Sequence, residues 1–308
     1  MRFLEPLKGT VNMAVVVAAL GYFVDIYDLV LFGVVRQASL IDIGIPEGEL
    51  LDKGRILLDA QMYGMLLGGI LWGIWGDKRG RLSVLFGSIL LYSVANILNA
   101  FVTDMTQYTI LRFLAGIGLA GELGAGITLV SEIIPKEKRG YSTAIVAAVG
   151  VSGAVVANFV ATMGSWQTAY IVGGVMGLAL LVLRLKVFES GMFDAIKEQA
   201  HVSRGNFMML FTNWQRFTRY AACILIGIPI WYVVAILVIF SPEFAKSMGA
   251  VGAVSAGAAI SWCYGGLVIG DLISGFMSQA LGSRRRIVGI FMLFSARYWW
   301  PVTAGLRA

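Results

Sequence analysis

Five ionisable side chains lie inside long apolar stretches of the sequence, where a charge is most costly. Four are acids, Asp25, Asp28, Glu122 and Asp271, and the fifth is Arg112. Such residues are rare in apolar spans unless they have a function, because hydrocarbon surroundings do not solvate a charge. The chemistry open to them is proton binding and release by the carboxyls and attraction of an anion by the guanidinium.

Other reactive groups are scarce, which disfavours an enzyme. The single histidine, His201, lies in a polar stretch, and the two cysteines, Cys223 and Cys263, lie in apolar stretches where they fit core positions. One histidine outside the apolar segments supports neither a zinc site nor a Ser-His-Asp triad. We therefore expect no metal and no cofactor.

The composition is that of an integral membrane protein. Hydrophobic residues make up 58% of the 308 residues and charged residues 14%, and the mean hydropathy is +0.80. The excess of six positive charges lies in short runs between apolar stretches. That pattern indicates membrane topology and does not indicate a nucleic-acid partner.

Eight stretches are long enough to cross a bilayer as helices of about 20 residues. We expect an all-α membrane protein with spans at 11–34, 57–76, 82–101, 108–134, 141–163, 168–187, 218–241 and 250–281. A ninth stretch, 287–305, has about the right length but carries Arg297 and Pro301. The first apolar run is too long for a signal-peptide core, so we expect an uncleaved first helix.

The distribution of basic residues predicts a cytoplasmic N-terminus in the cell (inner) membrane. The expected cytoplasmic segments hold the basic runs at 78–81, 136–139 and 284–286 together with Arg184, whereas the expected outer loops hold only Arg36, Lys53, Arg55 and Lys246. The longest polar interruption separates six spans from the rest. We expect a six-helix bundle at 1–188, a cytoplasmic linker at 189–216 and a partial second bundle at 217–308.

One turn pattern occurs twice, roughly 200 residues apart. Glycine, an acid or amide, and glycine recur at the same spacing, as Gly73, Asp77 and Gly80 and then as Gly275, Gln279 and Gly282. Each copy closes a long apolar segment with a basic turn. Such a duplication predicts two related halves, as in many transporters.

The first copy resembles the loop between helices 2 and 3 of the major facilitator superfamily, whose pattern is Gly-x-x-x-Asp-(Arg/Lys)-x-Gly-(Arg/Lys). Three further segments are similar to the branch of that family with sugar, phosphate and organic-acid porters: Gly21 to Asp28, Arg112 to Glu122, and Glu132 to Gly140. The resemblance covers most of the chain. It implies a six-helix bundle followed here by an incomplete second bundle, with eight or nine transmembrane helices in all.

The resemblance also implies roles for charged residues at the cytoplasmic side. There a latch would hold the cytoplasmic side shut through Asp77, Arg81, Glu132 and Arg139, with Gly73 and Gly80 allowing the helix ends to approach. In the second copy Gln279 stands where the first has Asp77, so a latch there would be weaker. The alternative is that these charges only set the topology.

In this family helices 1 and 4 line the central cavity, which implies a binding site there. Asp25 or Asp28, with Tyr27 between them, would form an ion pair with Arg112, and Glu122 would be a second titratable acid. Small residues at four-residue spacing, such as Gly64 with Gly68 and Gly69 with Gly73, should allow close helix contact. The alternative is a buried structural network without a role in transport.

We therefore expect a secondary transporter of a small polar or anionic metabolite, working by alternating access with protons as the partner ion. Gly150 to Gly153 lacks the Gly-Pro pair typical of the family's drug/proton antiporters, which favours symport. Two alternatives stay open, a truncated remnant that does not transport and, less favoured, a membrane-embedded enzyme. The repeat offset predicts about 400 residues, so the 308-residue chain could also self-associate to cover an incomplete bundle.

Overall fold

The protein is helical throughout the part that the computed structural model describes, which is residues 13–79, 81–133, 139–189, 207–250, 252 and 254–305. No strand occurs in these ranges. The all-α fold expected from the sequence is thus confirmed.

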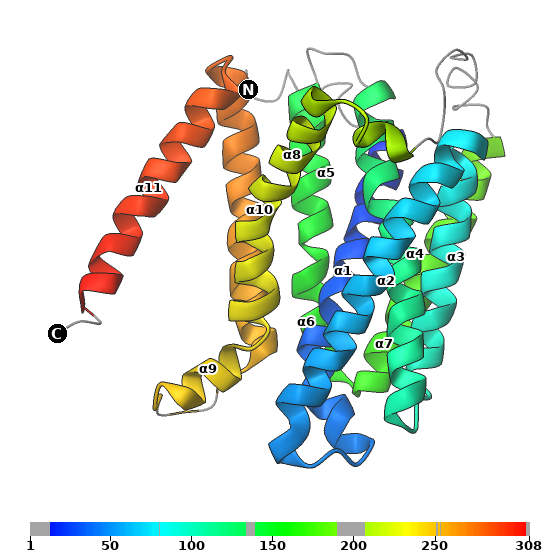
Figure 1. Ribbon diagram of the computed structural model, residues 1–308, viewed down its shortest axis with the longest axis vertical. Helices are drawn as coiled ribbons and strands as arrows, with labels where there is room; N and C mark the ends of the chain where they lie inside the picture. Colours follow the sequence, from blue (N-terminus) through cyan, green and yellow to red (C-terminus); the bar gives the residue numbers. More distant parts are fainter. Residues whose placement is uncertain are drawn as a thin grey trace.

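The first half is a bundle built around its first helix. Its elements are α1 (Met13–Asp42), the short turn η2 (Glu47–Glu49), α2 (Leu50–Arg79), α3 (Arg81–Asn99), α4 (Met105–Ile133), α5 (Arg139–Val151), α6 (Gly153–Met163) and α7 (Trp166–Glu189). α1 contacts α4, α5, α6 and α7, while α2 and α3 pack mainly on α4 (Figure 1). α5 and α6 together form the predicted span at 141–163, interrupted at Ser152.

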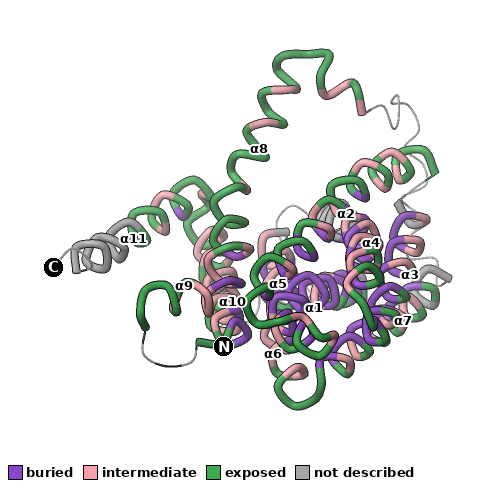
Figure 2. Tube along the Cα trace, turned by 60° about the horizontal axis from the view of Figure 1, so that its bottom comes forward, coloured by how far each residue is buried: buried purple, intermediate pink, exposed green. Residues whose placement is uncertain are grey.

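The second half is smaller and more exposed. It comprises η4 (Phe207–Leu210), α8 (Trp214–Tyr232), the π-helical turn η5 (Val233–Val238), α9 (Ser241–Ser247), α10 (Ala256–Ala280) and α11 (Arg284–Gly305). α10 lies along α5 and α6. α8 and the part of α11 up to residue 295 extend away from the bundle and are largely exposed (Figure 2). Their apolar surfaces suit contact with lipid.

Six described helices are long and apolar enough to cross a membrane, by length and composition. They are Val15–Asp42, Glu47–Arg79, Gly140–Met163, Trp166–Leu185, Trp214–Val238 and Ala256–Ala280, and Ser83–Asn99 is a shorter apolar helix. α4 and α11 coincide with the two other predicted spans.

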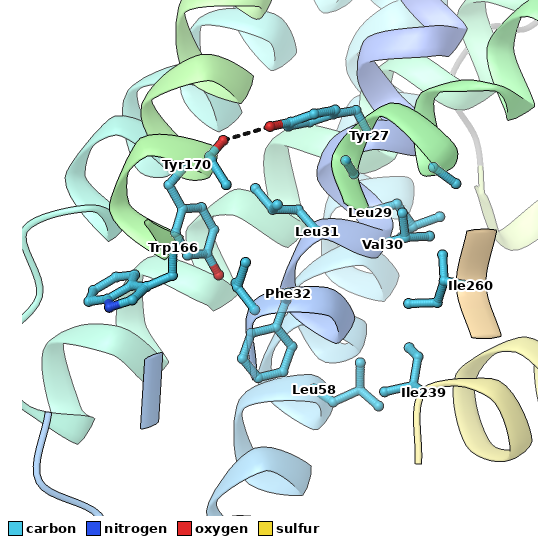
Figure 3. Packing of buried hydrophobic residues seen from close by; sticks show 14 of the residues in the cluster. Tyr27, Leu29, Val30, Leu31, Phe32, Leu58, Trp166, Tyr170, Ile239 and Ile260 are labelled. Carbon is cyan, nitrogen blue, oxygen red and sulfur yellow. Dashed lines mark hydrogen bonds between the residues drawn. The ribbon is translucent and has the colours of Figure 1, made fainter. Parts of the chain in front are cut away.

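The core is an apolar cluster that joins the two halves. Residues of α1 from Ile26 to Phe32 pack against Tyr170 on one side and against Ile239 and Ile260 of the second half on another (Figure 3). Because one helix contributes so much of this cluster, α1 positions both the bundle interior and the contact between halves.

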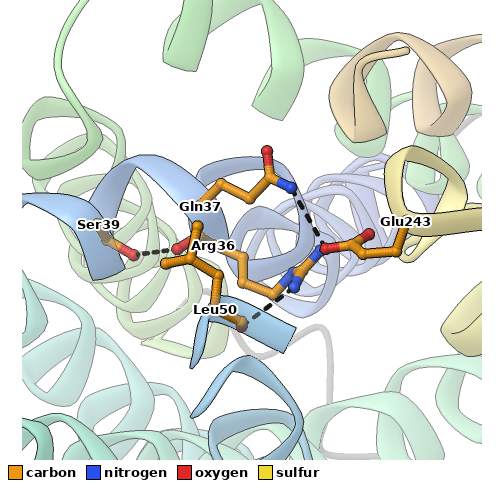
Figure 4. A network of polar contacts seen from close by, with 5 residues as sticks. All are labelled: Arg36, Gln37, Ser39, Leu50 and Glu243. Carbon is orange, nitrogen blue, oxygen red and sulfur yellow. Dashed lines mark hydrogen bonds and ion pairs between the residues drawn. The ribbon is translucent and has the colours of Figure 1, made fainter. Parts of the chain in front are cut away.

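The end of α1 differs from the sequence prediction. The helix continues to Asp42, eight residues beyond the predicted end at 34, so Arg36 lies in the helix and not in an outer loop. Its buried guanidinium pairs with Glu243 of α9 and donates to the Leu50 carbonyl (Figure 4). It also lies 4.5 Å from the centre of the Phe240 ring. The charge interrupts the hydropathy pattern but not the helix, because tertiary contacts compensate it.

The two copies of the turn pattern differ in what they contact. In the second, Gly275 packs on Ala144 of α5, Gln279 lies against Gly140, and Gly282 ends α10 with a φ of +58°, a conformation that favours glycine. In the first copy, a Cβ at Gly73 would meet no atom within 4 Å, and Gly80 lies outside the described residues.

Two glycine faces bring α2 and α4 into backbone contact. A Cβ at Gly64 would overlap the Phe113 carbonyl, and a Cβ at Gly116 would overlap the Gln61 carbonyl. Gly68 is equally close to Ile117, whereas Gly69 has open space around it. The expected close packing is therefore present on one face of α2, where small residues allow the backbones to approach.

We predict that Gly64→Ala destabilises the protein and that Gly69→Ala does not. The first methyl must push α2 from α4, at a cost of about 1 to 3 kcal/mol. The second adds a better helix former in open space and should stabilise by up to about 1 kcal/mol. Thermal unfolding midpoints of the two purified variants in one detergent test this. Equal midpoints would contradict the close contact.

Candidate functional site

The structure gathers the predicted acids and Arg112 in the interior of the first bundle. Asp25 and Asp28 lie on α1, and Arg112 and Glu122 lie on α4. Each is at most 3% exposed. The three-residue spacing of the two aspartates places them on one face of α1, toward α3, α4 and α7.

Glu122 is paired with an arginine of α7. Arg184 donates from Nη1 to Glu122 Oε2 at 2.9 Å, and its Nη2 contacts Oε1. The sequence pattern predicts only a topology role for Arg184. The ion pair could have been expected from the position of Arg184 inside the predicted span 168–187, because a charge in a span needs a partner.

Asp25 lies beside this pair without a direct partner. Its buried Oδ1 accepts no hydrogen bond, and the carboxyl interacts electrostatically with Glu122, Arg184 and Asp28. Gly21, one helical turn earlier, packs directly against the Arg184 and Glu122 side chains.

Asp28 is the second acid whose hydrogen bonding is incomplete. Neither of its buried carboxyl oxygens accepts a hydrogen bond of normal geometry, although Asn96 of α3 lies close enough to interact with the carboxyl. Gly173 of α7 lies against Oδ1, and Arg112 supplies an electrostatic attraction. Buried polar atoms in proteins are nearly always satisfied, which makes these two carboxyls candidates for proton binding.

Arg112 does not form the predicted ion pair with the aspartates. It donates instead to Gln61 of α2, and its guanidinium lies 5.0 Å from the Phe32 ring centre and 5.9 Å from that of Tyr170. The prediction relied on equal depths below the helix ends. With the observed ends, Asp28 lies about 21 Å from the end of α1, and Arg112 only about 10 Å from the start of α4.

Tyr27 holds two helices together. Its hydroxyl donates to the carbonyl of Ala169 on α7 at 2.8 Å (Figure 3). Nearby, the hydroxyls of Tyr108 and Tyr170 are 2.8 Å apart, and that of Tyr108 is 3.1 Å from Ser39 Oγ. These bonds fix the aromatic wall beside Arg112.

The expected latch stays a prediction. Asp77 is exposed near the end of α2, while the side chains of Arg81, Glu132 and Arg139 lie outside the described residues. From the second repeat, Asp271 of α10 is half-buried and interacts electrostatically with Tyr22 of α1.

Metal ligands do not gather among the residues that the structure describes. No group of three or more histidine, cysteine or acidic side chains in those ranges could hold a metal ion. His201 lies outside them.

Comparison with known proteins gives a family match over nearly the whole chain. The sequence model described as Major Facilitator Superfamily matches residues 13–300. A putative niacin/nicotinamide transporter of Bacillus subtilis is 30% identical over 184 residues, 58% of this chain and 45% of that protein. A putative metabolite transport protein of Haemophilus influenzae is 27% identical over 284 residues, 88% of this chain and 68% of that protein.

A solved structure has the same fold. The crystal structure of a D-xylose-proton symporter aligns with a TM-score of 0.53 at 17% identity, covering 86% of this chain and 66% of that one. The chain spans about half the length of the Bacillus relative and about two thirds of the other two proteins.

We predict strong energetic coupling between Glu122 and Arg184. Glu122→Gln or Arg184→Gln alone leaves a buried charge without its partner and should cost about 3 to 5 kcal/mol of unfolding free energy. The double variant should lose clearly less than the sum of the two losses. Unfolding by denaturing detergent measures all four proteins of the cycle.

The matched control is the exposed pair Arg55 and Asp59 on α2, whose coupling should be below about 1 kcal/mol. Additive losses at Glu122 and Arg184 would mean that the two side chains do not form this pair in the membrane.

Proposed function

The chain belongs to the major facilitator superfamily, and on that basis we propose that it is a secondary transporter that moves a small organic anion together with protons. The resemblance read from the sequence is confirmed by the family match. The chain is an integral, multi-pass membrane protein of a transporter family and not an enzyme. We further propose that it lies in the cell membrane with a cytoplasmic N-terminus.

The observation that carries the proposal is the buried charge cluster of the first bundle. Asp25, Asp28 and Glu122 are enclosed with Arg112 and Arg184 between α1, α4 and α7. Enclosing five ionisable groups is costly, and a purely structural network would satisfy its carboxyl oxygens. Carboxyls that lack hydrogen bonds can instead bind and release a proton, which couples substrate movement to a proton gradient.

The surroundings of Arg112 support an anionic substrate with a flat ring. Its guanidinium lies near the ring centres of both Phe32 (5.0 Å) and Tyr170 (5.9 Å), and its Nε has no hydrogen-bond partner. A carboxylate can bind a guanidinium in bidentate fashion, and aromatic faces stack on a planar ring. The niacin/nicotinamide transporter to which the chain is similar is named for a ring compound of this kind.

Alternating access would use the contact between the two halves. At the end where α1 passes into α2, Arg36 and Glu243 join the halves, while α10 packs along α5 and α6. Rocking of the halves would open and close this end. We propose the latch of Asp77, Arg81, Glu132 and Arg139, with Gly73 and Gly80, for the opposite, cytoplasmic end.

We predict the orientation from the basic residues. A cysteine placed at the exposed Glu47 should react with a membrane-impermeant reagent added outside intact cells, and one placed at the exposed Lys78 should not. Both single-cysteine variants are made after Cys223→Ser and Cys263→Ser. The reverse labelling pattern would overturn the orientation and the latch together.

We predict proton-driven uptake of nicotinate by vesicles containing the purified chain, and its loss in Asp25→Asn. Removing the titratable group should abolish accumulation against a gradient but leave exchange of nicotinate down its gradient, because only accumulation requires the proton. Asp59→Asn, an exposed aspartate of α2, is the control and should behave as wild type. Nicotinamide tests whether the negative charge is needed.

Two results would contradict this proposal. If vesicles with Asp25→Asn still accumulate nicotinate under a pH gradient, Asp25 does not couple uptake to protons. If the wild-type vesicles take up no nicotinate, the proposal that this chain transports such anions is wrong.

A further inference from the structure

The buried cluster has more acids than bases. Three carboxyls, Asp25, Asp28 and Glu122, are enclosed with two guanidiniums, Arg112 and Arg184. If all were ionised, one negative charge would have no counter-charge. In a low-dielectric interior an uncompensated carboxylate binds a proton, because burying the charge costs more than the neutral acid. From the charges of the described residues, we therefore expect one acid of this cluster to hold a proton while the others stay charged.

Geometry divides the acids unequally between the two arginines. Glu122 accepts a hydrogen bond from Arg184 Nη1 through Oε2, and its Oε1 contacts Nη2, so the two side chains form a charge-assisted ion pair. Asp28 is attracted by Arg112. Asp25 has no arginine of its own, because Arg184, which also attracts it, is paired with Glu122.

The packing keeps this division in place. Any side chain at Gly21 would overlap both Arg184 and Glu122, so α1 lies directly on their pair and Asp25 follows one turn later. The other charged or titratable groups that interact with this region are Asp28 of α1, Tyr92 of α3, and Tyr22 of α1, which also interacts with Asp271 of α10. None of these groups is positively charged, so none adds to the attraction that Arg184 exerts on Asp25.

We propose that Arg184 is a positioning residue that fixes Glu122 as a permanent anion and thereby leaves Asp25 as the acid that takes up the proton. This gives Glu122 and Asp25 different roles, whereas their sequence positions alone suggested the same one. The significance for transport rests on the proposed function, but the protonation itself can be measured without transport.

The test is infrared spectroscopy of the full 308-residue chain in lipid vesicles at neutral pH, where exposed acids are ionised. Only protonated carboxyls give the carboxylic-acid C=O band. Cell-free synthesis with carbon-13 in the carboxyl groups of either aspartate or glutamate identifies the residue type. We expect a band that shifts with labelled aspartate, does not shift with labelled glutamate, and disappears in Asp25→Asn but not in Asp59→Asn.

Variants of Arg184 test its role directly. Arg184→Gln should add a second band that shifts with labelled glutamate, because Glu122 then lacks its counter-charge. Arg184→Lys keeps the charge and should show the aspartate band alone. A simple packing role for Arg184 would not change the protonation of Glu122.

Three outcomes would overturn the proposal: a wild-type band that shifts with labelled glutamate, an aspartate band that survives Asp25→Asn, or no glutamate band in Arg184→Gln. The labelled wild-type chain decides the first even if a variant does not fold. An aspartate band in a chain without proton-driven uptake would contradict the proposed function and leave this inference standing.

Discussion

Compensation of buried charge is the constraint on which the arrangement of the first bundle depends. A carboxylate such as Glu122 can be enclosed between helices only where a cation reaches it, so α4 and α7 must bring Glu122 and Arg184 to the same level. α1 then packs on that pair at Gly21, which fixes the height of Asp25 and Asp28. The positions of three helices thus follow from one ionic contact and the absence of one side chain.

The length of α1 links this interior to the rest of the molecule. The helix holds the two aspartates in its middle and Arg36 near its end, where Arg36 meets Glu243 of α9. Between them, Phe32 packs beside Arg112, and Ile239 of the second half packs against Gly33. A shift of α1 therefore affects the charge cluster and the contact between halves together, as the proposed coupled transport would require.

The sequence predicted the helical fold, the family and the buried acids, because hydropathy, glycine spacing and charges in apolar spans are local properties. It did not predict which side chains pair with the buried charges. Arg184 and Arg36 were assigned to topology, since a basic residue near a predicted span end looks the same whether it faces water or a carboxylate. The Asp28 and Arg112 pair was wrong because the estimate used helix ends set by hydropathy, whereas Arg36 lets α1 continue to Asp42.

The two arginine pairs differ in a way that suits a rocking mechanism. Glu122 and Arg184 lie within one bundle and are shielded from solvent, so their pair can persist while the halves move as rigid bodies. Arg36 and Glu243 lie on different halves, and Glu243 is partly exposed, so water can replace each partner as the halves separate. Separation then costs much less than breaking a fully enclosed pair. In the proposed cycle the pair inside the bundle would keep its charge state, and the pair between the halves would break.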